Sequence, residues 1–324
     1  MQWWVHWGIQ SLLARAPGGR AIHRLMQERV GQLRRIETGN QFDNALQILK
    51  MASRESCSLA GQRVVEIGTG WVPAISVALA LVGCEVHTFD VSALTKPDYL
   101  RRTLAAWYPR LDEIAVAANQ LLIEVAERWE RLSRGQSLED LLQKHGGTYL
   151  APCDTTALPL ASESVDLVLS NLVLQCVAEE QVVPVLRESA RVLRPSGRAI
   201  HRIRMTDEYA QGDPNRHHLH FLTYEQETWN RWFNHRLKNQ NRWRTSQFLQ
   251  AFHDVGFLQH EVCRFRDIRG AAYFQQVALA PEFLWCDEDD LNTIGIDVVL
   301  HKTSSGNAPL NSQVDIAHPE SSTE

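Results

Sequence analysis

The chain has 324 residues, of which 44% are hydrophobic, and its formal net charge is -5. This length and apolar content allow a large buried core, and the acidic balance without a long basic run argues against a dominant nucleic-acid surface. The six cysteines form no CxxC pair, which is typical of reduced, buried thiols and not of a disulfide frame or a zinc site. There is no signal-peptide pattern and no apolar stretch long enough to span a bilayer, so we expect a cytoplasmic protein.

Residues 1–58 are expected to form a helical segment, because apolar residues recur there at helical spacing. Trp3, Trp4 and Trp7 make its beginning unusually aromatic. We expect this segment to pack on the rest of the protein. Weak peripheral contact with a membrane through the tryptophans is the alternative, although the segment supplies little of the basic face that an interfacial helix needs.

Residues 59–302 alternate between short apolar runs and helical patterns, which predicts a mostly parallel sheet with helices on both faces. A helix is expected over 72–82. Seven strands are expected, in chain order RVVEIG from 63, EVHTFDVS from 85, TYLAPCD from 148, VDLVLSN from 165, RAIHRIRM from 198, FLQHEVCRF from 257 and IDVVLHK from 296.

Two segments are longer than ordinary connections. Residues 96–146 carry an apolar helical stripe, and we expect them to form a helical cap on the carboxyl edge of the sheet. Residues 206–245, rich in His, Asn, Trp and Arg, are expected to help enclose a ligand there. The tail, 303–324, has few large apolar residues and is expected to be disordered.

The stretch GTG at residues 68–70 follows the first expected strand and leads into a helix. Glycines there permit a tight turn and close approach of the backbone to a ligand at the carboxyl ends of the strands. A dinucleotide-binding turn needs a third glycine to support a pyrophosphate, but this chain has Pro73 at that place. Proline suits the first turn of a helix, so the helix can begin while a dehydrogenase is disfavoured.

Acidic residues end the first three expected strands. Glu66 can meet the ammonium group of a ligand, directly or through the loop. Asp90 can accept both hydroxyl hydrogens of a ribose, and Asp154 can accept from an adenine amino group. An amino acid, a ribose and an adenine without a pyrophosphate are the parts of S-adenosylmethionine.

Ordered stretches between residues 60 and 205 resemble the successive motifs of class I S-adenosylmethionine-dependent methyltransferases: VVEIGTGW, VHTFD, APCDTTALPLASESVDLVLSNLVLQCV and ESARVLRPSGRAI. The chain is more similar still to a bacterial subgroup with GTGW-x-P after the first strand and HRI on the fifth. The resemblance implies a seven-stranded, mostly parallel Rossmann-like methyltransferase sheet and S-adenosylmethionine as the cofactor. It also implies a cofactor site that consists of Glu66, Gly68, Thr69, Gly70, Trp71, Asp90, Val91, Cys153, Asp154, Ser170 and Asn171.

Methyl transfer from a sulfonium is an in-line displacement, in which positioning of the acceptor carries much of the rate. An oxygen acceptor usually also needs a base, and histidine is the usual choice. His201, in the HRI motif, is the leading candidate base, and a hydrogen-bonded strand histidine is the alternative. Asp207 is the second candidate catalytic residue, because the subgroup pattern keeps an acid there.

The chain departs from the family pattern at two places. Many relatives have LEHV after the fourth strand, where this chain has LQCV, so Gln175 and Cys176 replace a Glu–His pair and no base is assigned there. After HRI the subgroup continues D-L-R-D-H, whereas here Arg204 replaces the first acid and Glu208 replaces the histidine.

His217 and His220, in NRHHLHF, and Asn234 and Arg236, in FNHRL, are expected to line the acceptor pocket; a surface position is the alternative. The histidines could bind a metal together with a neighbouring acid, but zinc-like spacing is lacking and no metal is expected. The basic run HRLKNQNRWR is short, so nucleic acid is not favoured as a partner.

Together these features predict a methyltransferase that O-methylates a small molecule or a glycan precursor. An RNA or protein methyltransferase is one alternative. A module that binds S-adenosylmethionine without catalysis is another, because the changes at residues 175–176 and 204 could reflect loss of turnover.

Overall fold

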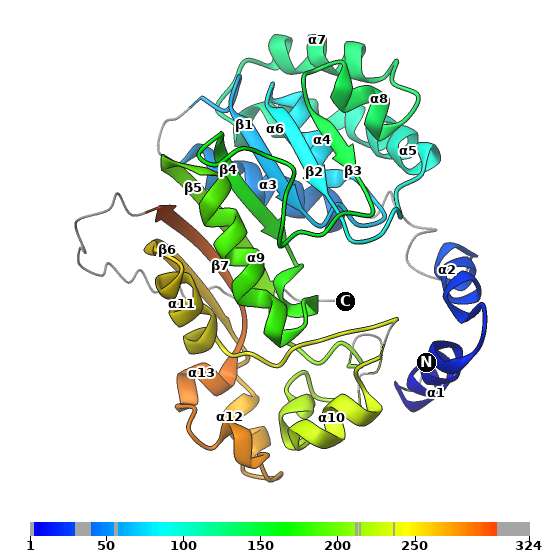
Figure 1. Ribbon diagram of the computed structural model, residues 1–324, viewed down its shortest axis with the longest axis vertical. Coiled ribbons are helices and arrows are strands. Elements are labelled where there is room, and N and C mark those ends of the chain that lie inside the picture. Colours follow the sequence, from blue (N-terminus) through cyan, green and yellow to red (C-terminus); the bar gives the residue numbers. More distant parts are fainter. Residues whose placement is uncertain are drawn as a thin grey trace.

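Seven apolar runs form one mixed sheet in the part of the chain that the structure describes (Figure 1). The structure is a computed structural model, and it describes residues 3–29, 40–54, 58–210, 213, 215–235 and 237–302. All the expected strands are present, and the fifth begins earlier than expected because its first residue already pairs with β4. The strands are β1 (Arg63–Ile67), β2 (Glu85–Phe89), β3 (Thr148–Leu150), β4 (Val165–Asn171), β5 (Leu193–Arg204), β6 (Phe257–Arg266) and β7 (Thr293–Lys302).

The strand order is β3-β2-β1-β4-β5-β7-β6. The strands from β3 to β5 are parallel to their neighbours, and β7 is antiparallel to both strands beside it. The chain moves outward from β1 to β3 and then returns to β4 on the other side of β1. Open α/β sheets bind ligands in the crevice outside the carboxyl ends of the strands at such a reversal. This topology therefore places the loops after β1, β2 and β4 at a candidate site.

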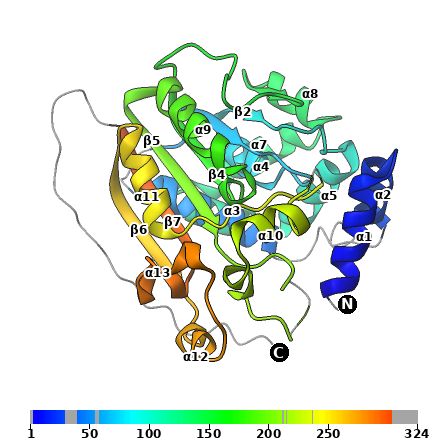
Figure 2. The same ribbon diagram turned by 60° about the horizontal axis from the view of Figure 1, so that its bottom comes forward.

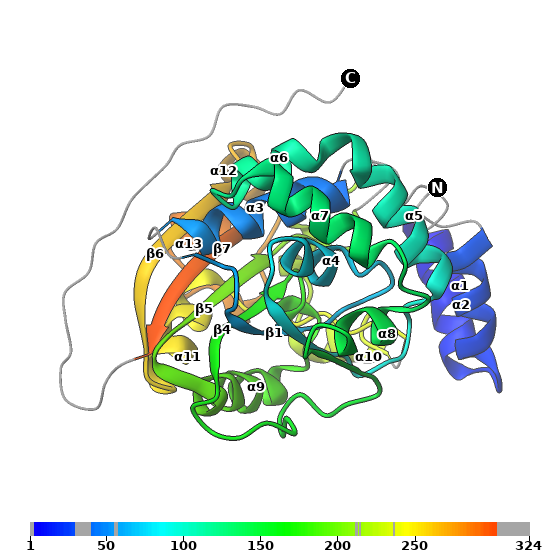
Figure 3. The ribbon, with the colours of Figure 1, turned by 90° about the horizontal axis from the view of Figure 1, so that it is seen from above.

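Helices cover both faces of the sheet, as the apolar periodicity predicts (Figure 3). The strands themselves are nearly continuous buried runs, which is expected of a sheet covered on both sides. On one face lie α9 (Glu179–Val192) and α11 (Thr245–Asp254). On the other lie α3 (Asn40–Ser53), α4 (Ala74–Leu81), α5 (Pro97–Trp107), α6 (Leu111–Ala117), α7 (Leu122–Leu132) and α8 (Leu138–Gln143).

The helices between β2 and β3 extend the layer of α4, so the prediction that residues 96–146 cap the carboxyl edge is wrong. Arg128 of α7 donates a hydrogen bond to the carbonyl of Leu81 over 3.4 Å. Gln120 donates to the carbonyl of Val82 over 2.8 Å. Both carbonyls lie at the carboxyl end of α4, just before the amino end of β2. The apolar stripe of this segment is real, but it is buried against α3 and α4.

Residues 206–245 lie over the carboxyl ends of β4 and β5 and contain α10 (Gln226–Trp232). The side-chain amide of Asn241 donates to the carbonyls of Leu174 and Val177, over 2.7 and 2.8 Å, and so joins the segment to the loop that follows β4. Buried aromatic residues of this segment pack with residues from the connection between β6 and β7. That connection contains α12 (Gly270–Phe274) and α13 (Glu288–Asn292).

The helices near the amino terminus fall into two groups. α1 (Trp3–Arg15) and α2 (Gly19–Arg29) lie side by side at one side of the molecule (Figures 1 and 2), whereas α3 packs into the core of the sheet domain. Trp7 of α1 donates from its ring nitrogen to the carbonyl of Trp232 over 2.7 Å, while Trp4 is exposed. No described helix is long and apolar enough to cross a membrane. The expected tail, 303–324, lies outside the described residues.

Candidate active site

Backbone hydrogen bonds join the loops after β1, β2 and β3 into one continuous edge. The N–H of Gly68 donates to the carbonyl of Phe89 over 2.8 Å, and the N–H of Asp90 donates to the carbonyl of Leu150 over 3.2 Å. The N–H of Cys153 donates back to the carbonyl of Asp90 over 2.8 Å. The glycines and acids that the sequence places at successive strand ends are therefore held beside one another.

The turn after β1 requires glycine for two different reasons. Gly68 and Gly70 have φ angles of +83° and +67°, a region that side chains other than glycine rarely adopt. A Cβ on Gly68 would lie 2.5 Å from Cγ2 of Val173, in the loop after β4, so this position leaves no room for a side chain. A Cβ on Gly70 would meet nothing within 4 Å. Gly70 thus presents its backbone to open space, as close approach of a ligand requires.

Asp90 fixes the conformation of this turn. One carboxylate oxygen accepts from the N–H of Gly70 over 2.8 Å, and the other accepts from the N–H of Ser92 over 2.8 Å. Burial raises the pKa of Asp90, and these two hydrogen bonds oppose the shift. Each carboxylate oxygen has a second lone pair, so both can still accept from the hydroxyls of a ligand. The residue can therefore hold the turn and a ribose together.

Glu66 is a buried carboxyl group beneath the turn. Only 2% of the residue is exposed, and it accepts a hydrogen bond from the hydroxyl of Ser76. Removal from water raises the pKa of Glu66 to about 7; the hydrogen bonds from Ser76 and Thr88 oppose this shift, and the charge of Asp90 adds to it. A carboxyl group with such a pKa ionises readily when a cation is placed beside it. This suits the expected contact with an ammonium group.

The remaining residues of the turn differ in what they offer a ligand. Thr69 is turned inward, where its hydroxyl lies 2.5 Å from that of Thr88. Trp71 is half-buried, and the guanidinium of Arg24, on α2, lies 6.0 Å from the centre of its ring. The helical pair at the amino terminus therefore reaches the edge of the candidate cofactor site.

The loops after β2 and β3 supply an apolar side chain and an acid. Val91 is 68% exposed, as a residue that flanks an adenine needs to be. Cys153 is half-buried, and its N–H is bonded to the carbonyl of Asp90, the residue before Val91. Asp154 is exposed, and one of its oxygens accepts from the backbone and the hydroxyl of Thr156, over 2.9 and 2.7 Å. These hydrogen bonds lower the pKa of Asp154, so the acid is an ionised acceptor.

His201 and Ser170 bond to each other inside the core, below the candidate pocket. Ser170 Oγ lies 2.9 Å from His201 Nδ1, both residues are fully buried, and the imidazole stacks on Phe252 of α11. Burial lowers the pKa of His201 to about 3. This geometry fits the hydrogen-bonded strand histidine that the sequence left open and contradicts a solvent-facing base. Ser170 does not close the pocket, whereas the half-buried Asn171 accepts from Arg202 over 3.2 Å at the strand tip.

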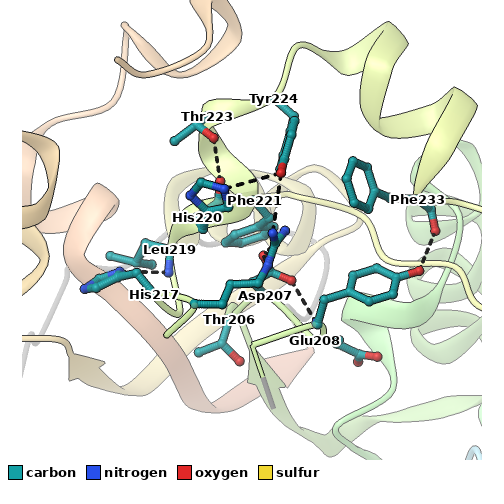
Figure 4. A network of polar contacts seen from close by, with 12 residues as sticks. Thr206, Asp207, Glu208, His217, Leu219, His220, Phe221, Thr223, Tyr224 and Phe233 are labelled. Carbon is teal, nitrogen blue, oxygen red and sulfur yellow. Dashed lines mark hydrogen bonds and ion pairs between the residues drawn. The ribbon is translucent and has the colours of Figure 1, made fainter. Parts of the chain in front are cut away.

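Asp207 is occupied by a buried ion pair, which does not support its candidate catalytic role. Its carboxylate accepts from Arg216 over 2.7 Å and from the N–H of Tyr209 over 2.8 Å (Figure 4). Its own N–H donates to the carbonyl of His218 over 2.6 Å. These contacts fold the chain after β5 into a fixed loop, and Asp207 is fully buried within it.

The two histidines expected to line the acceptor pocket contact aromatic side chains, and Figure 4 shows His220 beside Tyr224. The ring of His217 stacks on Tyr273 of α12 with 3.9 Å between ring centres. His220 bonds to the hydroxyl of Tyr273 and lies 3.3 Å from that of Tyr224, and burial lowers its pKa to about 4. These contacts tie His217 and His220 to α12 and to Tyr224. Among the described residues, no three metal-binding side chains lie close enough together to hold a metal ion.

Asn234 forms hydrogen bonds within its own segment. Its carbonyl oxygen accepts from the N–H of Gln240 over 3.0 Å, and its amide donates to Asn230 over 3.1 Å. Arg236 lies outside the described residues. The described structure therefore places none of the residues expected to contact the acceptor at the strand tips.

A group that the sequence analysis did not bring together lies over the tips of β4 and β5. Glu208 is at its centre: Cys176 Sγ and Arg204 Nη2 lie 3.6 and 3.8 Å from one of its oxygens, and Lys238 Nζ lies 3.6 Å from the other. We call these four residues the polar cluster. Cys176 has exposed surface, yet protein atoms surround it closely enough to raise its pKa. Its thiol is therefore accessible at the edge of the polar cluster.

Comparison with known proteins identifies a methyltransferase domain. The family model of that description matches residues 116–201, from the end of α6 into β5. No curated protein sequence matches the chain.

Solved structures with a similar fold include S-adenosylmethionine-dependent enzymes from several bacteria. Magnesium protoporphyrin IX methyltransferase from Synechocystis is 14% identical, with 88% of this chain and 99% of that chain covered and a TM-score of 0.46. The 1,6-didemethyltoxoflavin N1-methyltransferase from Burkholderia thailandensis is 14% identical, with 89% and 92% covered and a TM-score of 0.45. A methyltransferase from Mesorhizobium loti is 18% identical, with 78% and 96% covered and a TM-score of 0.41.

The strand order, with β7 antiparallel to its neighbours, and the polar loops at the strand tips define a Rossmann-like domain of the methyltransferase class. The match of residues 116–201 to the methyltransferase model supports an S-adenosylmethionine-dependent methyltransferase, with S-adenosylmethionine as the cofactor that this class uses. This confirms the resemblance to the class. The closer likeness to a bacterial GTGW-x-P subgroup stays a prediction.

Proposed function

We propose that this enzyme O-methylates a small molecule or a glycan precursor. S-Adenosylmethionine, when bound, supplies a methyl group that is already activated on a sulfonium sulfur. Glu66, Asp90 and Asp154 would hold its ammonium, ribose and adenine, and the open side of Gly70 would allow it to lie against the backbone. The acceptor would lie beside it, over the tips of β4 and β5.

The observation that carries this proposal is a set of hydrogen bonds that fastens a segment over the tip of β4. Asn239 donates to the carbonyl of Cys176 over 3.2 Å, and Asn241 bonds to the same loop, so residues 206–245 are fastened across it. Cys176 of the polar cluster belongs to this same loop. A segment fastened over the strand tips suits a small acceptor or the end of a glycan and disfavours a folded macromolecule.

The basic run that could have suggested RNA is largely used inside the protein. Arg242 and Arg244 are 2% and 0% exposed. Arg242 donates to the carbonyl of Phe221 over 2.9 Å, and Arg244 donates to those of Met205 and Asp290 over 3.2 and 2.8 Å. These guanidinium groups hold loops together, and they offer no charge to a phosphate backbone. This argues against the RNA alternative.

Release of S-adenosylhomocysteine from S-adenosylmethionine tests the proposed function. The full-length protein would be assayed with a panel of hydroxy compounds, carboxylic acids and sugar precursors, and separately with bulk RNA and with peptides. We expect turnover with at least one small acceptor and none with RNA. Stimulation by RNA or peptide alone would overturn the proposal, and tight binding of S-adenosylhomocysteine without any turnover would favour the non-catalytic module.

A further inference from the structure

The helix α2 exposes an apolar stripe to solvent. Ile22, Leu25 and Met26 recur at helical spacing and are 48%, 47% and 39% exposed. A helix on the surface of a globular protein normally turns such a stripe toward the core. α2 instead lies beside α1 at one side of the molecule (Figures 1 and 2). The stripe is therefore open to a partner from outside the chain.

The stripe faces away from the candidate cofactor site. Cζ of Arg24 lies 6.0 Å from the centre of the Trp71 ring, so this arginine marks the side of α2 that is nearest the glycine turn. Successive residues of a helix are rotated by about 100° around its axis. Ile22 and Met26 are therefore roughly 160° away from Arg24 around the helix. A ligand at the strand tips does not account for the exposed stripe.

The neighbouring helix α1 exposes further apolar side chains and fixes the pair to the protein. Leu12 is 72% exposed and Trp4 is 54% exposed. Trp7 joins α1 to α10, because its ring nitrogen donates to the carbonyl of Trp232 over 2.7 Å. The tryptophans are thus only a part of the exposed apolar surface, and the aliphatic residues of the two helices form the rest.

Positive charge gathers on this helical pair. Residues 3–29 contain four arginines and one glutamate, whereas the whole chain has a formal net charge of -5. Three of these arginines belong to α2, and Arg24 is exposed on the side opposite the stripe. A helix with an apolar face and arginines on its polar face is typical of helices that lie in the interface of a bilayer. Anionic lipid headgroups attract such cations.

The same charge argues against a second copy of the chain as the partner. In a symmetric dimer the same surface meets itself, so two positively charged helices would be brought together. Their repulsion would oppose the burial of the apolar stripe. An anionic bilayer offers an apolar interior and negative headgroups together, and so it matches both features of α2.

We propose that α2 docks on a bilayer that contains anionic lipids. Ile22, Leu25 and Met26 enter the boundary between the headgroups and the acyl chains. The contact is peripheral, because no described helix is long and apolar enough to cross a membrane. The contact between Arg24 and Trp71 then places the cofactor turn near the lipid surface. This inference is independent of the acceptor class and of turnover.

Sedimentation with vesicles tests the contact directly. We would mix the full-length protein with vesicles of phosphatidylcholine alone and with vesicles of equal parts phosphatidylcholine and phosphatidylserine, and measure the protein that sediments. The partition coefficient is expected to be about tenfold higher on the anionic vesicles, and added salt should reduce this preference. A lack of binding to the anionic vesicles would overturn the inference.

Two double variants separate the stripe of α2 from non-specific apolar attraction. Ile22→Gln with Leu25→Gln should lower the partition coefficient about tenfold. Leu122→Gln with Ile123→Gln is the matched control, because these residues of α7 are 49% and 62% exposed but precede an acid, Glu124. The control should bind vesicles as the wild type does. Equal loss in both double variants, or loss in neither, would contradict docking through α2.

Hydrogen exchange locates the contact on the chain. Anionic vesicles should slow the exchange of backbone amides in residues 19–29 and leave residues 122–132 unchanged; slower exchange in α7 alone would overturn the inference. Light scattering without lipid tests the second copy: a dimer that the Ile22→Gln, Leu25→Gln variant loses, together with no vesicle binding, would assign the stripe to self-association. Calorimetry with S-adenosylhomocysteine on each variant reports the cofactor site, so a failure of docking leaves the proposed function standing.

Discussion

Gly68→Ala tests the packing that holds the cofactor turn against the loop after β4. The added Cβ would lie 2.5 and 3.1 Å from the two methyl carbons of Val173, on a backbone with a φ of +83°. Overpacking of this kind costs about 1–3 kcal/mol, and a left-handed residue other than glycine costs about 1–2 kcal/mol. We therefore expect the free energy of unfolding to fall by roughly 2–5 kcal/mol. The affinity for S-adenosylhomocysteine should fall too, because the turn must move away from Val173.

Gly61→Ala is the matched control for this prediction. Its φ is +80°, but a Cβ there would meet nothing within 4 Å. It should lose only the backbone part, about 1–2 kcal/mol, and should bind S-adenosylhomocysteine as the wild type does. A double-mutant cycle of Gly68→Ala with Val173→Ala isolates the contact and should give a favourable coupling of about 1–3 kcal/mol. Urea unfolding followed by circular dichroism and calorimetry measure both quantities. Equal losses in Gly68→Ala and Gly61→Ala, with cofactor affinity kept in both, would refute the steric argument.

Three further predictions concern single residues. Asp90→Ala should weaken binding of S-adenosylhomocysteine by roughly 100-fold, because it removes hydrogen bonds to a charged group worth about 1.5–3 kcal/mol each. Asp98→Ala, at an exposed position, is the control. Equal binding by both variants would remove the ribose assignment. His201→Leu should retain turnover. The pKa of His201 is depressed to about 3 in the folded protein, so the wild type should lose stability as pH falls from 6.5 toward 3, and this loss should be absent in the variant. Lost turnover with intact cofactor binding would restore the histidine as a base. The pKa of Glu66, about 7 instead of 4.5, means that the folded state holds an extra proton between these values, so stability should fall as pH rises from 4.5 to 7. Glu66→Gln should remove that slope, as urea unfolding at pH 5 and pH 8 would measure, and an unchanged slope would contradict the burial argument.

The sheet could be predicted from the sequence because its strands are buried on both faces. In a chain that alternates between strands and helices, a short apolar run such as VVEI followed by glycine can form little other than a buried parallel strand. The position of residues 96–146 could not be predicted in the same way. Helical periodicity shows that one face is buried but does not say against what. Here that face packs on α3 and α4 at the amino end of β2.

The site was predictable as far as strand ends determine it. Gly68, Asp90 and Cys153 follow successive parallel strands, so their loops had to meet at one edge. The role of His201 depends instead on the register of β5 against β4, which pairs it with Ser170. The partners of His217 and His220 come from α12, far along the chain. Contacts of this kind follow from the tertiary fold, and a local pattern does not encode them.

The departures from the family pattern gain a meaning when their positions are compared. Cys176, Arg204 and Glu208 stand where the resemblance places His, Asp and His, and the structure brings Cys176 and Arg204 each within 4 Å of Glu208. The exchange places an arginine where the pattern has an acid, and Lys238 adds a second cation. Loss of catalysis requires no replacement charge and no coordination between positions far apart in sequence. Under the subgroup resemblance, these replacements change the charge of one contact group, which a change of acceptor would require and a simple loss of turnover would not.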